Sequence, residues 1–546
     1  MKKRLSLVLL SLLLLFTSAP ASASLQSIDA YSDVPVWHWA ASYIEAAAED
    51  GLMEGTGDGR FGLGQTIDRA SFVTILCRMF DWELVTPDTP SFDDCGSDDW
   101  YYPYVETALA HDVFSGGASF YPDQAITRQD MAVMLVRGLG YDTLAQSLSA
   151  SSPFPDVSDD VGYISIAYRI GMITGIEKNG QTLFQPDANA TREQAAVMLM
   201  RVYERYTSKV DWLHGFYALS AYSQIDLTTE MDAVSLGWSY LTTDDSGSPW
   251  LNTTSENGNS WAVPDGYEIA LDYFQANGTD YNLNVYSTDD DLLASADSRD
   301  AAVSDIVAAA AAYNGVTIDY EELFDSDKEN FTAFMTALRA QLPSDQLLYV
   351  CVPPVTLTEG YYDGYDYHAL GELCDKVILM AHDYQVSSLS ADAVGTDQTD
   401  TPLTPFKQVY AALVAITDKT TGVADVSKIA LAISFSGVAW NVDSDGLLLS
   451  QTAAVPSLST IYSRLTQSDT VIGWSDVYQN PFADYTTDDG ISHYRLWYED
   501  ARSVEAKVRL AKLFGITGIS LWRIGTIPNG DASVYWNVWD TLLAER

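Results

Sequence analysis

The stretch GVTIDYEEL, residues 315–323, decides the fold of the larger part of the chain. It starts as a β-strand, because residues 316–318 are all β-branched and suit a pleated, half-buried surface. It then turns acidic, with Asp319, Glu321 and Glu322 inside four residues. Alternate side chains of a strand point to the same side, so Asp319 and Glu321 share one face. A buried strand that ends in carboxylates predicts an active site; the alternative is the acidic first turn of a following helix.

Runs of the same kind recur after about residue 210 and alternate with segments of helical periodicity. Eight strands with helical crossovers in roughly 330 residues predict an α/β fold, a (β/α)8 or TIM barrel over residues 210–546. The interval between the last two strands exceeds one helix, which predicts a small insertion on the catalytic face at about 441–497. The predicted strands are Leu213–Leu219, Ala233–Trp238, Tyr281–Tyr286, Gly315–Tyr320, Leu347–Val352, Lys376–Ala381, Ile429–Phe435 and Gly518–Trp522.

A barrel explains why the fourth of these strands ends in acids. The carboxyl ends of parallel barrel strands open onto the active site, so Asp319 and Glu321 are expected to point into it. The stretch also resembles the DGxDxDxE signature of family 18 glycoside hydrolases. Gly315, Asp319 and Glu321 match that signature, whereas Asn314 and Thr317 replace its first and middle aspartates.

Three further motifs support the same resemblance, in the expected order along the chain. The segment ILMAHDYQ resembles the family's M-x-Y-D on strand six, with Met380 and Asp383 kept and His382 in place of the tyrosine. The segment GISLWRIG resembles strand eight, with Trp522 as the tryptophan under the sugar. The segment from 483 to 508 resembles the branch of the family found in spore-cortex and LysM-bearing cell-wall hydrolases.

The resemblance implies substrate-assisted, retaining hydrolysis, an exception to the two-carboxylate mechanism of most glycosidases. In that mechanism Glu321 protonates the glycosidic oxygen while the 2-acetamido carbonyl of the sugar attacks the anomeric carbon. Asp319 orients and stabilises the acetamido group, which Asp383 and His382 also hold. Trp522 packs under the bent sugar.

Two replacements in these motifs affect the expected chemistry. Thr317 can donate a hydrogen bond to Asp319 but cannot share a proton with it as a second acid would. His382, unlike a tyrosine, can titrate near neutrality. Thr317, Tyr320 and Met380 complete the predicted substrate-binding residues beside Trp522.

The first third of the chain is a triplicate. Each copy has an aromatic-x-Asp opening, an amphipathic helix, a glycine turn, an arginine and a second apolar-periodic helix, which predicts an all-α helix-loop-helix unit. The predicted units are 30–82, 91–141 and 154–206. The opening aspartate and the arginine lie 36, 34 and 36 positions apart in the pairs Asp33 and Arg69, Asp94 and Arg128, and Asp156 and Arg192.

The three copies resemble S-layer homology domains, through the F-x-D opening and the helix starts ITRQD and ATREQ; the first copy has IDRAS. The resemblance implies a pseudo-threefold bundle that binds a pyruvylated secondary cell-wall polysaccharide in grooves between copies. A guanidinium near a helix N-terminus suits such a carboxylate. The alternative is that each arginine pairs with the opening aspartate of its own copy. Trp39 and Trp100 are candidates for stacking on sugars or for core packing. The predicted polymer-binding residues are Arg69, Arg128, Arg192, Asp33, Asp94 and Asp156.

Charge and the N-terminus indicate where the chain works. It has 29 Lys+Arg against 75 Asp+Glu, a net charge of −46, which disfavours nucleic acid and anionic membranes as partners. The balance suits a neutral or amino-sugar partner, or serves solubility alone. A basic start, an apolar run over 7–16 and a small-residue site at 21–23 predict a signal peptide over residues 1–23. We therefore expect an exported protein without membrane insertion.

No cofactor or metal is expected from the sequence. The cysteines are Cys77, Cys95, Cys351 and Cys374, with no CxxC, and their pairing is left open. The segment 441–446 resembles a calcium loop, but Thr452 stands where an EF-hand needs glutamate.

Together these features predict an exported, wall-anchored glycosidase that cuts beside N-acetylglucosamine and acts as a monomer. Peptidoglycan is the favoured substrate and chitin the alternative, because the anchor would hold the barrel against the wall. The competing hypotheses are a catalytically inactive carbohydrate-binding barrel and a structural S-layer component. A complete acid pair favours the enzyme.

Overall fold

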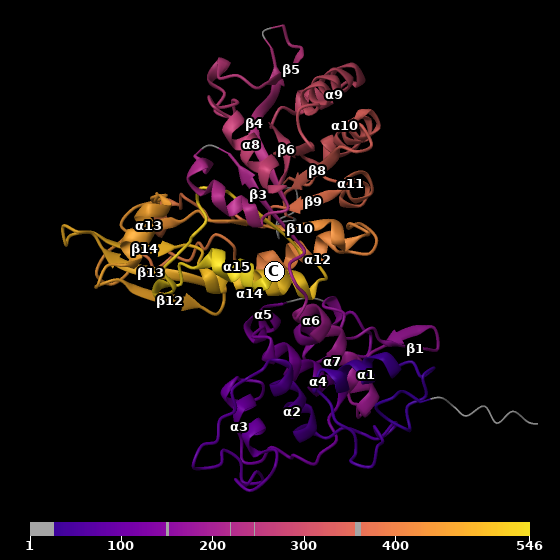
Figure 1. Cartoon of the computed structure of the whole chain (residues 1–546). Coiled ribbons are helices and arrows are strands. Elements are labelled where there is room, and N and C mark those ends of the chain that lie inside the picture. The colour runs from indigo at the N-terminus through magenta and orange to yellow at the C-terminus, as the bar shows by residue number, and fades with distance from the viewer. Residues whose placement is uncertain (1–26, 149–151, 219, 245, 355–361) are drawn as a thin grey trace, which may run out of the picture.

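The computed structural model describes residues 27–148, 152–218, 220–244, 246–354 and 362–546. A helical part formed by the N-terminal third lies below a barrel, and a small antiparallel sheet projects from the barrel's side (Figure 1). The predicted signal peptide lies outside the described residues, and so does Leu219 at the end of the first predicted strand.

The barrel is closed by eight parallel strands, because the first strand pairs with both the second and the last. This confirms the predicted (β/α)8 fold, and each of the eight predicted strands is present. Apolar and small residues fill the strands, which are buried along most of their length. The strands are β3 (Trp212–Tyr217), β4 (Ala233–Thr243), β6 (Asp280–Ser287), β7 (Gly315–Tyr320), β8 (Leu347–Val352), β9 (Lys376–Leu379), β10 (Ile429–Ser434) and β15 (Gly518–Trp522).

Helices surround the barrel and bury one apolar face each against the strands. Several begin at a side-chain cap; Asp500, for example, accepts hydrogen bonds from the backbone of Arg502 and Ser503. The helices are α8 (Glu268–Asn277), α9 (Ala296–Ala310), α10 (Lys328–Gln341), α11 (Tyr367–Leu373), α12 (Phe406–Ile416), α14 (Ala501–Leu513) and α15 (Val538–Glu545).

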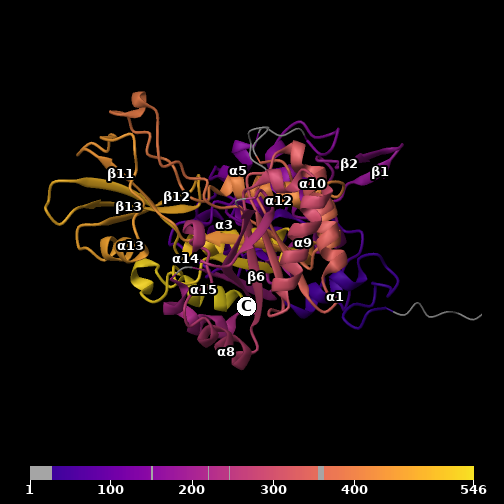
Figure 2. The ribbon, with the colours of Figure 1, turned by 90° about the horizontal axis from the view of Figure 1, so that it is seen from above.

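Two additions extend the barrel at the carboxyl ends of its strands. Strand β5 (Pro249–Asn252) pairs antiparallel with the end of β4 and forms a hairpin. Between β10 and α14 the chain forms a four-stranded antiparallel sheet in the order β11-β14-β13-β12, which confirms the predicted insertion. This sheet extends well beyond the barrel when the molecule is seen from above (Figure 2). Its elements are β11 (Val438–Val442), α13 (Leu458–Leu465), β12 (Val471–Ser475), β13 (Asn480–Thr486) and β14 (His493–Trp497).

The helical part consists of three helix pairs whose central loops interlock. The backbone N–H of Ile67 donates to Ala190, that of Ala190 to Ile126, and that of Ile126 to Ile67, so the three repeats close a ring. This confirms the predicted pseudo-threefold bundle. The pairs are α1 (Ala41–Glu49) with α2 (Arg69–Met79), α3 (Tyr102–Ala110) with α4 (Arg128–Gly138), and α6 (Val161–Arg169) with α7 (Arg192–Tyr206).

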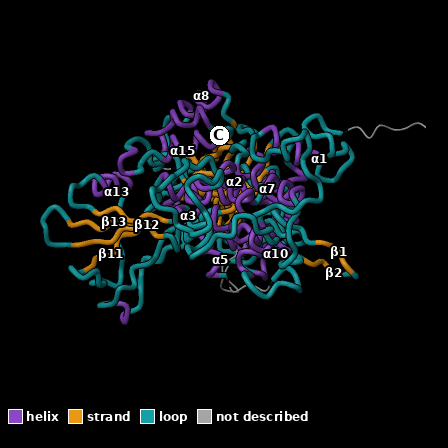
Figure 3. The backbone as a smooth tube through the Cα atoms, turned by 90° about the horizontal axis from the view of Figure 1, so that it is seen from below, coloured by secondary structure: helices purple, strands orange, loops and turns teal. Residues whose placement is uncertain are grey.

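Two elements of the helical part stand outside this pattern. A short helix, α5 (Asp142–Ser147), follows the second pair, and a hairpin of β1 (Ile176–Lys178) and β2 (Gln181–Leu183) interrupts the third. Seen from below, the hairpin lies on the opposite side of the molecule from the sheet β11–β14 (Figure 3). In the described parts of the chain, every helix is too short or too polar to cross a membrane.

The bundle packs directly on the barrel helices α12 and α14. The guanidinium of Arg205 donates to the carbonyls of Ile170 in the bundle and Leu513 in the barrel, at 2.9 and 2.8 Å. The rings of Tyr141 and Phe406 lie 5.2 Å apart. One buried apolar cluster runs through both parts, so they share a core.

Candidate active site

Asp319 and Glu321 lie where β7 reaches the open end of the barrel. Asp319 is the fifth residue of the strand and is opposite Tyr286 of β6 in the register. Glu321 follows the strand, and its backbone N–H still donates to Ser287 at 2.9 Å. The alternation of the strand therefore places both acids on the barrel side, and Glu322, with a φ of 62°, turns the chain away.

Asp319 is almost completely enclosed, with 3% of its surface exposed. Burial raises the pKa of this carboxyl to about 6, while the Asn284 amide, the Cys351 thiol and the His382 ring act in the opposite direction. The Asn284 amide nitrogen lies 3.5 Å from Oδ2. Oδ1 is buried without a hydrogen-bond donor among the described residues. An acceptor in this state suits an amide N–H supplied by a ligand.

Glu321 is half-buried and lies in a field of negative charge. Burial and then the carboxylates of Asp319, Glu322 and Asp383 raise its pKa to about 8. The group is therefore protonated at neutral pH, which is the state that a general acid needs.

His382 and Asp383 follow β9 and face the same end of the barrel. The His382 ring nitrogen Nδ1 lies 2.9 Å from Asp383 Oδ2. Burial alone would raise the pKa of Asp383, but His382, Ser434 and Gln385 lower it below its ordinary value. Asp383 therefore stays ionised while Glu321 stays protonated, and the two carboxyls have different roles.

Trp522 ends β15, at the same end of the barrel as these acids. Its ring lies 5.2 Å from that of Phe216 on β3 and 6.2 Å from that of Trp261. Met380 packs, partly exposed, against the same apolar cluster in the barrel. Both residues therefore lie at or just after a strand end, and their contact with substrate stays a prediction.

The prediction that Tyr320 binds substrate is wrong. Strand alternation turns its side chain away from the barrel interior, where its ring packs 5.7 and 6.2 Å from Phe331 and Phe334. Its hydroxyl donates to the carbonyl of Asp289, and 1% of the residue is exposed. The residue is part of the core between the strand and helix α10.

The prediction that Thr317 contacts substrate is also wrong. Thr317 is fully buried inside the barrel, and its hydroxyl lies 2.6 Å from that of Ser235 rather than serving Asp319. Ser235 lies 2.8 Å from Nε2 of His214, whose Nδ1 lies 2.8 Å from Ser520. Burial lowers the pKa of His214 to about 3, so this chain of four side chains is uncharged. Sequence analysis missed His214, although strand alternation places it inward.

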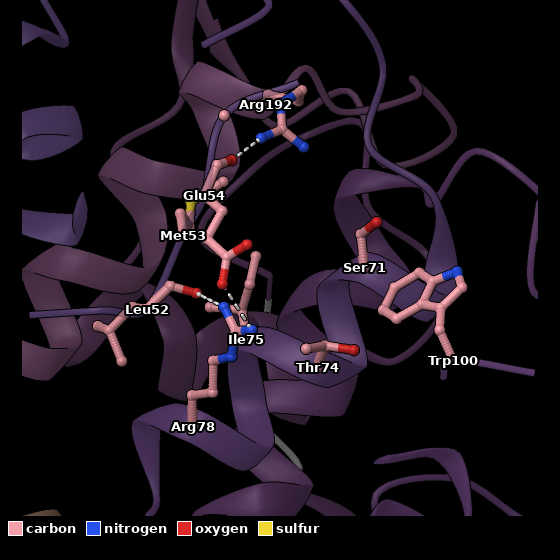
Figure 4. A pocket seen from close by; sticks show the side chains of 10 residues that line it. Leu52, Met53, Glu54, Ser71, Thr74, Ile75, Arg78, Trp100 and Arg192 are labelled. Atoms are coloured by element: carbon pink, nitrogen blue, oxygen red, sulfur yellow. Dashed lines mark hydrogen bonds and ion pairs between the residues drawn. The ribbon is translucent and has the colours of Figure 1, made fainter. Parts of the chain in front are cut away.

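A second candidate site is a pocket of about 190 Å³ in the helical bundle. All three repeats contribute to it: the 52–55 turn and helix α2 from the first, Trp100 from the second and Arg192 from the third. Trp100 is 60% exposed and faces the pocket from the side opposite Leu52 and Glu54, and Ser71 and Thr74 lie between (Figure 4).

The arginines at the helix starts join neighbouring repeats. Each Nε donates to a phenylalanine carbonyl of the next repeat in the cycle, and each guanidinium lies about 5 Å from that ring. The alternative, in which each arginine pairs with the aspartate of its own repeat, is therefore wrong. The pairs are Arg69 with Phe120, Arg128 with Phe184, and Arg192 with Phe61.

The opening aspartates accept hydrogen bonds from the backbone of their own repeats, and their role as polymer ligands stays a prediction. Asp33 accepts from the N–H groups of 61, 62 and 63. Asp94 accepts from 120 and 121, and Asp156 from 184 and 185. Each carboxylate thus fixes the loop that the neighbouring arginine contacts.

The grooves between neighbouring repeats, of which the pocket at Trp100 is one, differ in whether the chain itself fills them. Arg78 of α2 lines the open pocket and pairs with Glu54 at 3.0 Å. Arg137 is the counterpart of Arg78 in the second repeat, because it lies nine residues after Arg128 as Arg78 does after Arg69. Arg137 instead pairs with Asp142 of α5 at 2.9 Å. Helix α5 packs so closely on α6 that a Cβ at Gly162 would lie 1.9 Å from the Ala145 carbonyl. The second groove is therefore occupied by the chain itself.

Comparison with protein families finds matches in both parts of the chain. Residues 286–526 match the model of glycosyl hydrolases family 18. Residues 30–73, 91–132 and 153–196 each match that of the S-layer homology domain.

Curated relatives match one part or the other. The chain is 31% identical over 180 residues to the surface-layer 125 kDa protein of Lysinibacillus sphaericus, which is 32% of this chain and 15% of that protein. It is 26% identical over 217 residues to the cortical fragment-lytic enzyme of Bacillus subtilis (strain 168), 39% of this chain and 47% of the relative. The chain thus spans about half or less of these relatives.

Solved structures with a similar fold include two bacterial proteins. The spore cortex-lytic enzyme SleL of Bacillus cereus has a TM-score of 0.49 and 18% identity, over 72% of this chain and 86% of its own. The C-terminal domain of a putative chitinase from Desulfitobacterium hafniense DCB-2 has a TM-score of 0.49 and 21% identity, over 62% and 99%.

Proposed function

Because the chain carries three S-layer homology domains and a glycoside hydrolase domain of family 18, we propose that it is an exported, wall-attached glycosidase that cleaves beside N-acetylglucosamine. The observation that carries the proposal is the difference between two neighbouring acids. Burial and the charges of Asp319, Glu322 and Asp383 all raise the pKa of Glu321, whereas the Asn284 amide, the Cys351 thiol and the His382 ring oppose the effect of burial on Asp319, so Glu321 is the acid that keeps its proton to the higher pH. This is an acid beside a carboxylate, as substrate-assisted hydrolysis needs.

The reaction proceeds in two steps. Glu321 donates its proton to the glycosidic oxygen as the acetamido carbonyl oxygen of the sugar bonds to the anomeric carbon and the bond to the leaving sugar breaks. Asp319 accepts the acetamido N–H at its free Oδ1 and stabilises the positive oxazolinium. Water then attacks the anomeric carbon and its proton passes to Glu321. The bond between that carbon and the oxazolinium oxygen breaks, which restores the acetamido group, and the configuration is retained.

Peptidoglycan is the favoured substrate. The helical bundle is fixed to the barrel by a shared core, so attachment to a wall would hold the active site beside that wall's glycan. The cortical fragment-lytic enzyme among the relatives is named for its action on cortex. Product analysis by mass spectrometry on purified peptidoglycan and on chitin oligomers tests this choice. New reducing N-acetylglucosamine ends are expected from peptidoglycan. If products form only from the chitin oligomers, chitin is the substrate instead.

A catalytically inactive sugar-binding barrel is the second candidate function. The enclosed floor of Trp522 and Phe216 would serve binding alone as well as catalysis. If the protein binds oligomers but forms no product after long incubation, it is a sugar-binding barrel without activity.

We expect His382→Tyr to stay active and to change the pH dependence of kcat/KM between about pH 5 and 8. A tyrosine hydroxyl can donate to the acetamido oxygen, but the substitution removes the ring that lies 2.9 Å from Asp383 and lowers the pKa of that carboxyl, so Asp383 should take up a proton at a higher pH. Both proteins would be assayed on one N-acetylglucosamine oligomer. Superimposable profiles would mean that His382 does not touch the reacting sugar.

For wall attachment we propose that the open pocket between Trp100 and Arg78 binds the secondary polysaccharide. Arg78→Ala is expected to weaken binding of the full chain to purified walls by about tenfold, the usual effect of losing a charge-assisted hydrogen bond. Arg137→Ala is the matched control, because Arg137 pairs with Asp142 in the groove that α5 fills. Both variants would be cosedimented with walls and with walls stripped of secondary polymer. Equal losses for both arginines would contradict the assignment of the pocket.

A further inference from the structure

A second pocket, of about 310 Å³, is lined in part by Tyr286 of β6, which is opposite Asp319 of β7 in the strand register. It is formed by the hairpin of β4 and β5, by the loop that follows as far as Trp261, and by Tyr286 of β6. Nothing in the catalytic steps above uses it. Its volume is at the lower end of the range for small-molecule sites, which suits one sugar ring.

An aromatic wall connects this pocket to the catalytic floor. The ring of Trp261 lies 6.2 Å from that of Trp522 and 5.2 Å from that of Tyr286, which in turn stacks 5.7 Å from Tyr240. Tyr286 is close enough to the acid that, after burial, the charge of Glu321 is the largest cause of its raised pKa. A glycan strand on Trp522 would therefore continue onto Trp261.

The loop that carries Trp261 is held in a defined shape. The side-chain amide of Asn259 donates to the carbonyls of Asn252 and Thr254 at 3.0 and 2.9 Å. Its oxygen accepts the backbone N–H of Trp261 at 2.8 Å. The indole lies against β4 at Gly237, where a Cβ would come within 3.0 Å of the ring. These bonds pre-organise the tryptophan, which reduces the entropy lost on binding.

The lining of the pocket is polar but uncharged. Besides the aromatic rings, it presents hydroxyls and amides, among them Thr242, Thr243 and Asn257. Among the described residues that line it, none is ionisable apart from the tyrosines. In a chain of net charge −46, a pocket without a cation disfavours a carboxylate. Aromatic faces and neutral hydrogen-bonding groups match the faces and hydroxyls of an uncharged pyranose.

We propose that this pocket is a subsite for an uncharged pyranose ring of the same glycan strand, next along the strand from the rings held at Trp522. The ring is N-acetylglucosamine, or muramic acid whose lactyl carboxyl is amidated by its peptide. This inference rests on the proposed function, and it makes Trp261 a residue that determines the length of glycan bound.

The test separates binding from cleavage by using the full chain with Glu321→Gln, so that oligomers are not consumed. Adding Trp261→Ala is expected to weaken binding of the N-acetylglucosamine tetramer by about tenfold. The affinity for the monosaccharide should not change, and Trp261→Phe should restore much of the tetramer affinity. Ile269→Ala, at a 61% exposed position on α8, is the matched control. Calorimetry would measure each affinity.

Each outcome has one meaning. If Glu321→Gln binds no oligomer, the proposed function fails; if it binds the tetramer equally well with and without Trp261, the subsite fails. Glycan fragments with their peptides should bind more tightly than the same fragments after amidase treatment, which exposes the lactyl carboxylates. Equal or tighter binding of the treated fragments would overturn the assignment of an uncharged ring.

Discussion

Glu321→Gln is expected to lower the rate of glycan hydrolysis by about 10²–10⁴-fold, the usual contribution of a general acid. The amide has nearly the shape of the carboxyl group but cannot supply a proton to the leaving oxygen. The raised pKa of Glu321, about 8, is the reason that this proton is present at neutral pH in the native protein. Turnover on an N-acetylglucosamine oligomer would be measured beside binding of the same oligomer.

Glu322→Gln is the control for this variant. Glu322 is the next residue, exposed and turned away from the barrel, and contributes only part of the negative field around Glu321. Its removal should change the rate by a few-fold at most. Near-native turnover of Glu321→Gln, or an equal loss in both variants, would exclude Glu321 as the acid.

Asp319→Asn is expected to lower kcat by about 10²–10³-fold, the range for loss of a group that stabilises charge in the transition state. An asparagine oxygen can still accept the acetamido N–H, but it has no charge with which to stabilise the oxazolinium. The measurement is kcat and KM on one oligomer; the loss should fall on kcat, because the contact is made mostly in the transition state.

The same substitution has a second effect, on the pH profile. In the native protein kcat/KM is expected to fall below about pH 6, as Asp319 takes a proton, and above about pH 8, as Glu321 loses one. Asp319→Asn removes a like charge beside Glu321, so its pKa falls and the alkaline limb moves to lower pH. Burial, the larger cause, remains, so the limb stays above the ordinary range of a glutamate. An unchanged alkaline limb would show that the two acids do not interact.

Strand and repeat periodicity explain what could be predicted from sequence. The eight strands, the inward side of Asp319 and Glu321, and the three helix pairs follow from local patterns with periods of 2 and 3.6 residues. The same rule places Tyr320 on the outer side of the barrel. Tyr320 was predicted to bind substrate because it lies between the two acids in the motif, and that prediction ignored the alternation. The family motifs located Trp522 and Asp383, because each lies in a short motif at a strand end.

Those local patterns do not predict contacts between segments that are distant in the sequence. Arg192 contacts Phe61, 131 positions earlier, because the repeats close into a ring; within one repeat nothing indicates that partner. Trp261 has no motif around it, and its place beside Trp522 depends on a loop held by Asn259 and on Gly237. The filling of the second groove by α5 likewise depends on a close approach at Gly162.

The sequence by itself therefore determined the fold, the order of the repeats and the barrel, and the position of Asp319 and Glu321 at a strand end, because these depend on residue type and spacing along one strand or helix. The tertiary structure alone decided that the pKa values of those acids are raised, since burial raises both and the charges of Asp319, Glu322 and Asp383 raise that of Glu321 further. It also decided which arginines are committed to neighbouring repeats and which groove stays open. Burial and proximity are properties of the closed barrel and the closed ring of repeats, and neither exists until segments far apart in the sequence have packed together.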